Sequence, residues 1–120
     1  VNSLALSPDG LQLVSASNDQ TAKIWSYAKG NVLHNLKGHT WRVLDVAFGP
    51  KGEYLVTGSN DQTARLWEVS SGKQVRIFKP EGRDYFRAVG MTRDGKHAIT
   101  GSLVRKDEGD AGILMWSTGF

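Results

Sequence analysis

The sequence predicts an all-β fold, and three observations support this prediction. The segment of residues 13–25, LVSASNDQTAKIW, returns 42 residues later, at residues 55–67, as LVTGSNDQTARLW. Nine of its 13 positions are identical, and the other four exchange similar residues. Turn signals separate strand-like segments at intervals of about 8–12 residues, which is typical of antiparallel all-β proteins. No segment shows a sustained helical periodicity, so helices are not expected.

The elements follow the same order in each repeat. A first, apolar strand is expected at residues 1–7, 43–49 and 86–92. It runs into a turn that ends on Gly10, Gly52 or Gly95, where glycine suits the positive φ of a tight hairpin. A second strand is expected at 11–16, 53–58 and 96–101, and a third ends on Trp25, Trp67 or Trp116. A fourth is expected at 32–36 and 75–79.

A repeat of about 40–45 residues, with an aspartate six residues before a tryptophan, is typical of one blade of a β-propeller. The chain therefore divides into three units, at approximately 1–40, 41–83 and 84–120, of which the last lacks its outer strand. It also carries an insertion around residues 103–109. Because closed propellers have about 4–8 blades, the chain is expected to be part of a larger ring.

Composition narrows the function classes. The 15 basic and 12 acidic residues give a net charge of +3, but the basic residues are scattered rather than clustered on one face as nucleic-acid binding requires. The absence of cysteine excludes disulfides and zinc–thiolate sites, and it is compatible with a reducing compartment, so an intracellular location, cytoplasmic or nuclear, is expected. No apolar stretch is long enough to span a membrane.

These motifs together resemble the WD-repeat, or β-transducin-like, propeller family, over essentially the whole chain. The family pattern is matched by a Gly-His pair at residues 38–39, by the turn Ser-Pro-Asp-Gly at 7–10 and by the segments SASND at 15–19 and TGSND at 57–61. The final Trp-Asp of the pattern is Trp-Ser or Trp-Glu here.

The resemblance implies a buried hydrogen-bond network in each blade. The second unit holds all four members of the network, and the other two units hold three each. The members are His39, Thr57, Asp61 and Trp67 in the second unit, Ser15, Asp19 and Trp25 in the first, and Thr100, Asp110 and Trp116 in the third. A histidine, a hydroxyl and a carboxylate could instead form a nucleophilic set. The recurrence of the same positions favours a structural role, and no catalytic residue, metal site or cofactor is predicted.

A second group of residues is predicted to face partner proteins. Trp41 is the only tryptophan outside the repeating position. The alternative is that Trp41 packs between two blades. Tryptophan, tyrosine and arginine are enriched at interface hot spots. The predicted rim comprises Thr40, Trp41 and Arg42 with Asp84, Tyr85 and Arg87, extended by Arg105 and Lys106 of the insertion, which could equally be a solvated loop.

The leading hypothesis is therefore a non-enzymatic scaffold that presents loops to partner proteins or flanking domains. Two alternatives remain, a catalytic or small-molecule-binding propeller and a nucleic-acid-binding propeller. The remaining blades of the ring are the other expected partners, supplied by the same polypeptide or by self-association.

Overall fold

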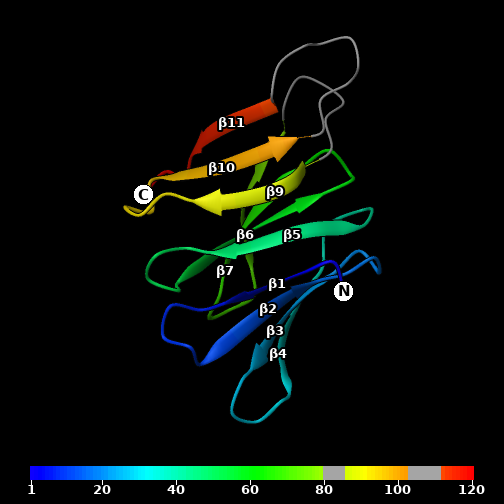
Figure 1. Cartoon of the computed structure of the whole chain (residues 1–120), viewed down its shortest axis with the longest axis vertical. Helices are drawn as coiled ribbons and strands as arrows, with labels where there is room; N and C mark the ends of the chain where they lie inside the picture. The colour runs from blue at the N-terminus through cyan, green and yellow to red at the C-terminus, as the bar shows by residue number, and fades with distance from the viewer. Residues whose placement is uncertain (80–85, 103–111) are drawn as a thin grey trace.

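The structure is a computed structural model that describes residues 1–79, 86–102 and 112–120. These residues form eleven strands and no helix, so the all-β prediction is confirmed. The strands group into three antiparallel sheets that follow one another along the chain (Figure 1). Among the described residues, none lies in a helix with the length and apolar character to cross a bilayer.

Each sheet is a meander in which consecutive strands pair. The first contains β1 (Ser3–Leu6), β2 (Gln12–Ala16), β3 (Ala22–Ser26) and β4 (Val32–Leu36). The second contains β5 (Val43–Phe48), β6 (Tyr54–Ser59), β7 (Ala64–Glu68) and β8 (Gln74–Phe78). The third has three described strands, β9 (Phe86–Met91), β10 (His97–Ser102) and β11 (Gly112–Ser117). We refer to the three sheets as blades one to three.

The strand ends differ slightly from the predicted ranges. β1 ends at Leu6, because Ser7 closes the turn: its backbone carbonyl accepts from Gly10 N at 2.9 Å, and its own N–H donates to Gln12 O at 2.9 Å. β8 is Gln74–Phe78 rather than 75–79, because Gln74 pairs with Trp67 across an irregularity in the register. The expected positive φ is present, at 73°, 72° and 73°, in the turn glycines Gly10, Gly52 and Gly95.

The three repeating tryptophans occupy equivalent places on the third strands. Trp25 pairs with Leu13, Trp67 with Leu55 and Trp116 with Ala98 on the preceding strand of each blade. The sequence repeat is therefore a repeat of strand register.

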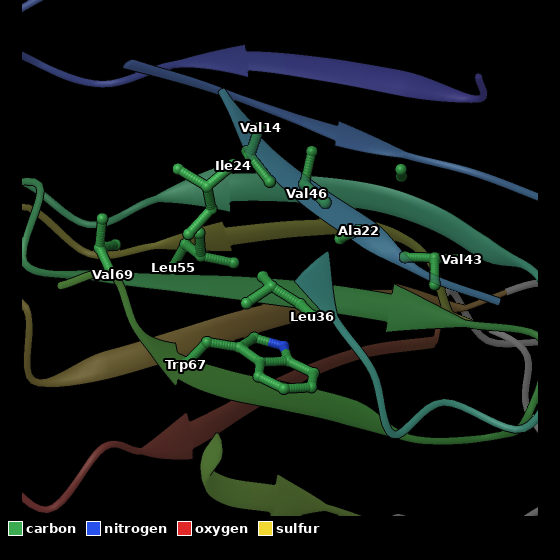
Figure 2. Packing of buried hydrophobic residues seen from close by; sticks show 10 residues of the cluster. Val14, Ala22, Ile24, Leu36, Val43, Val46, Leu55, Trp67 and Val69 are labelled. Carbon is green, nitrogen blue, oxygen red and sulfur yellow. The ribbon is translucent and has the colours of Figure 1, made fainter. Parts of the chain in front are cut away.

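The blades pack face to face through two apolar clusters. Between blades one and two, Val14 and Ile24 meet Leu55 and Trp67 (Figure 2). Between blades two and three, the fully buried Phe86 lies in a cluster with residues of both sheets, and Trp116 and Phe78 stack with ring centroids 5.4 Å apart. The first strand of blade two, β5, lies beside both β1 and β9.

The strand directions define two ends of the molecule, and we use two names for them. The turn end carries the turns that follow the first strands of the three blades, which lie at the left of Figure 1 with the C-terminus, and the turns that follow β3 and β7. The rim end carries the turns after the second strands and the loop at residues 37–42.

Candidate partner-binding rim and the network beneath it

Blade two contains a continuous hydrogen-bonded chain of four side chains. The Trp67 indole Nε1 donates to Thr57 Oγ1 at 2.9 Å, and Thr57 Oγ1 lies 2.6 Å from His39 Nε2. His39 Nδ1 lies 2.8 Å from Asp61 Oδ2. A carboxylate can only accept, so Nδ1 carries a proton, and in the neutral ring Nε2 then accepts from the Thr57 hydroxyl. All the bonds then run in one direction, from Trp67 to Asp61.

Asp61 is the terminus that collects these bonds. Its Oδ1 accepts from the backbone N–H and the hydroxyl of Thr63, at 2.9 and 2.6 Å, and its Oδ2 also accepts from Thr40 N at 3.0 Å. Burial opposes ionisation of this carboxyl, but the hydrogen bonds from His39 and Thr63 outweigh it, so the pKa of Asp61 lies well below its usual range. Arg65 Nη2 lies 3.7 Å from Asp61 Oδ2 and adds positive charge beside it. The carboxylate is therefore ionised at neutral pH.

Blades one and three contain reduced forms of the network. Trp25 Nε1 donates to Ser15 Oγ at 3.0 Å, and Trp116 Nε1 donates to Thr100 Oγ1 at 2.9 Å. In blade one, Asp19 accepts from the Thr21 hydroxyl and approaches Lys23, which lowers the pKa of Asp19 to about 2. The Trp-to-hydroxyl bond is thus common to all three blades, whereas among the described residues the connection to a histidine occurs in blade two.

This arrangement does not suit nucleophilic chemistry. The Thr57 hydroxyl and the His39 ring are fully buried. The polar side-chain atoms that form the network already have hydrogen-bond partners within it. A nucleophilic hydroxyl needs access to a substrate and an oxygen lone pair that is not already taken up by a hydrogen bond. The described residues also contain no group of three or more histidine, aspartate or glutamate side chains that could hold a metal. What the network does is hold the loop above it.

In that loop, hydrogen bonds hold the backbone of residues 40–42 in place, while the side chains of these three residues stay accessible. Ser59 Oγ donates to Arg42 O at 2.8 Å, Asn60 N donates to the same carbonyl at 3.0 Å, and Thr40 N is held by the Asp61 carboxylate. The side chains of Thr40, Trp41 and Arg42 are exposed. Trp41 has 49% of its surface accessible, so it does not pack fully between two blades.

The other predicted rim residues divide into two groups. Arg87 is exposed on β9, one residue after the buried Phe86, at the same end of the molecule as the loop. Asp84, Tyr85, Arg105 and Lys106 lie outside the described residues, as does Asp110 of the third network. The structure therefore places Thr40, Trp41 and Arg42 on one loop of blade two, and Arg87 at the start of β9, the first strand of blade three.

Sequence reasoning missed several residues that organise this region. Thr63 and Ser59 bind the network and the loop, although both sit at positions that repeat as Thr21 and Ser17. That repetition was the available signal.

Sequence reasoning also missed Asp45, which lies on the first strand of blade two, β5. Asp45 Oδ1 accepts from Ser3 Oγ at 2.6 Å and Asp45 Oδ2 accepts from Val89 N at 2.8 Å. One carboxylate therefore bridges β1, β5 and β9. An aspartate inside the apolar strand VLDVAF, with serine or alanine at the same place in the other units, was its only trace in the sequence.

The other two histidines lie on strands. His34 is on β4, and its Nε2 lies 3.0 Å from Ser70 O, so it links blade one to a turn of blade two. His97 lies on β10.

Comparison with known proteins decides the family. The family model "WD domain, G-beta repeat" matches residues 1–26 and 30–68, which is more than half of the chain. The chain belongs to the WD40 repeat family.

Several curated proteins are similar over one repeat. The nuclear distribution protein PAC1 of Arthroderma benhamiae is 44% identical over 48 residues, which cover 40% of this chain and 10% of that protein. PAC1 of Tuber melanosporum is 46% identical over 48 residues, covering 40% of this chain and 11% of that protein. Human WD repeat-containing protein 86 is 49% identical over 39 residues, which cover 32% of this chain and 10% of that protein. The matched region thus spans about a tenth of the length of these relatives.

Proposed function

We propose that this chain is part of a non-enzymatic interaction scaffold, and that the loop carrying Trp41 is a contact site for a partner protein. WD40 repeats generally mediate protein–protein interactions, and the family is typically non-enzymatic. The relatives named nuclear distribution proteins share one repeat with this chain, so the proposal extends to partner binding and not to nuclear distribution. An intracellular location belongs to the same proposal.

The observation that carries the proposal is the contrast between backbone and side chains in residues 40–42. Ordering a loop on binding has an entropic cost, and a loop that is already fixed avoids that cost. Here hydrogen bonds with Ser59, Asn60 and Asp61 hold the backbone in place, while a half-exposed tryptophan and an exposed arginine remain available. Such side chains on a fixed backbone supply large contact area at low entropic cost.

Affinity capture with quantitative mass spectrometry tests the proposal. Wild-type chain is compared with Trp41→Ala and with Tyr27→Ala, a matched control that truncates an exposed aromatic residue in a turn at the turn end. Loss of a hot-spot residue costs at least about 2 kcal/mol, or roughly a thirtyfold loss of affinity. We expect a set of proteins that Trp41→Ala loses and Tyr27→Ala retains. Identical protein profiles for all three chains would contradict the proposal.

A further inference from the structure

The loop that carries Trp41 lies against a largely buried cation, Arg65 on β7. Arg65 follows Asp61 by four residues, and its side chain is only 12% exposed. A charge that is shielded from water to this extent needs partners within the protein.

Each nitrogen of the Arg65 guanidinium has such a partner. Nε donates to Thr63 Oγ1 at 3.3 Å, Nη1 donates to Gln74 Oε1 at 2.8 Å, and Nη2 lies 3.7 Å from Asp61 Oδ2. Because the guanidinium is planar and its donors point in fixed directions, these three contacts define its position. Arg65 therefore joins β7 to the outer strand β8 and to the carboxylate that binds Thr40 N.

The backbone of the loop lies directly against the guanidinium at Gly38. A Cβ atom on Gly38 would lie 2.7 Å from Arg65 Nη1 and 3.3 Å from Gln74 Oε1, so a side chain there would collide with the cation. Gly38 also has a φ of 154°, which favours glycine. Arg65 thus supports the loop at two points, directly at Gly38 and through Asp61 at Thr40.

The same position differs in the other two blades. The strand register puts Lys23 of blade one and Leu114 of blade three at the place of Arg65. Lys23 pairs with Asp19 at 3.3 Å, and their side chains are 31% and 51% exposed, so this is a surface ion pair of the kind that contributes little. Among the described residues, the buried cation is therefore a feature of the blade that carries the exposed loop.

We propose that Arg65 is a positioning residue for the loop that carries Trp41. It holds Gly38 directly and Thr40 through Asp61, so that the exposed side chains of the loop reach a partner in a single arrangement. Its role in binding rests on the proposed function. Without Arg65 the loop populates further arrangements, and the apparent affinity falls in proportion to the fraction of molecules that keep the binding arrangement.

Amide hydrogen exchange of the 120-residue chain, measured residue by residue, tests the positioning without a partner. Arg65→Met keeps most of the aliphatic stem and removes the guanidinium. We expect the Thr40 amide to exchange at least about tenfold faster, since losing a hydrogen bond to a charged group shifts a local equilibrium by that much or more. The amide of Val56, in the middle of β6, should change little. Equal acceleration of both amides would indicate a general loss of stability and would overturn the proposal.

Two further variants control this measurement. Lys23→Met removes the cation at the equivalent place in blade one, and it should leave Thr40 exchange unchanged; acceleration equal to that of Arg65→Met would count against the proposal. Arg65→Lys keeps the charge but lacks the planar set of donors, so its Thr40 amide should exchange at a rate between those of wild type and Arg65→Met. If Arg65→Met does not fold, Arg65→Lys gives the test, and wild-type exchange at Thr40 in that chain would overturn the inference.

Gly38→Ala tests the contact between the loop and the guanidinium. Its Cβ meets Nη1 in the wild-type chain but not in Arg65→Met, whose shorter side chain does not reach that place, whereas the effect of φ is the same in both. Gly38→Ala should therefore speed Thr40 exchange more in the wild-type chain than in Arg65→Met. Equal effects in the two chains would show that the contact does not position the loop.

Affinity capture separates this inference from the proposed function. If Arg65→Met leaves the binding arrangement in about a tenth of the molecules, it should bind the proteins that Trp41→Ala loses about tenfold more weakly than wild type. Lys23→Met should retain these proteins. Full retention by Arg65→Met would overturn its role in binding. A wild-type chain that captures no Trp41-dependent protein contradicts the proposed function instead, and the exchange measurements then test Arg65 on their own.

Discussion

The Thr57 hydroxyl connects Trp67 to His39 in the blade-two network, and its removal tests how much the network stabilises the fold. Thr57→Val keeps the side-chain shape but deletes the acceptor for Trp67 Nε1 and the donor to His39 Nε2. Both partners are buried and have no water to replace the lost bonds. Each stranded group costs about 1–3 kcal/mol, so Thr57→Val should lower the free energy of unfolding by about 2–6 kcal/mol.

The other two blades provide a graded series for the same experiment. Thr100→Val strands one indole N–H, on a partly buried tryptophan, and should cost about 1–3 kcal/mol. Ser15→Ala strands the indole N–H of Trp25, which is likewise partly buried, and should also cost about 1–3 kcal/mol. Urea unfolding followed by tryptophan fluorescence measures each loss. A Thr57→Val chain no less stable than Ser15→Ala would refute the reasoning.

Further predictions concern acid, packing, exchange and association. Because the pKa of Asp61 is lowered in the folded state, its stabilising contribution is complete above about pH 4 and is lost as the pH falls further. Asp61→Asn lacks this titrating group, so between about pH 5 and pH 2 it should lose less stability than the wild type. Acid titrations followed by circular dichroism measure both losses. Trp67→Ala should cost about 3–5 kcal/mol in urea unfolding, since the ring lies in the core between blades one and two. Amide exchange should be faster in β10 than in β6, because blade two has its histidine link; better protection of β10 would contradict this ranking. Leu4 and Ile113, exposed by 65% and 68% on the two outermost blades, should drive self-association of the 120-residue chain in sedimentation experiments at micromolar concentration, and a well-folded monomer would count against it.

The sequence alone determined the architecture, because a repeat carries its structural information many times over. The recurrence of LVSASNDQTAKIW as LVTGSNDQTARLW set the strand order, the turn glycines and the equivalent registers of Trp25 and Trp67. Strand ends were less well determined: β1 stops at Leu6 because Ser7 uses its backbone groups in the turn, which is a local hydrogen-bond choice that composition does not reveal.

The members of the network could also be named from sequence, because each sits at a repeating position. Its direction could not, since the tautomer of His39 depends on which nitrogen meets Asp61. The sequence also left open whether Trp41 is buried or exposed, because a tryptophan at this position could either pack between two blades or lie on the surface. The structure decides that it is exposed.

Tertiary structure alone decided the contacts between blades. The bridge from Asp45 to Ser3 and Val89 joins residues that are 42 and 44 positions apart in the sequence. The physical reason is that a repeat pattern specifies what each blade does to itself. The surfaces between blades depend on how neighbouring sheets stack, and that stacking brings together residues that no local pattern connects.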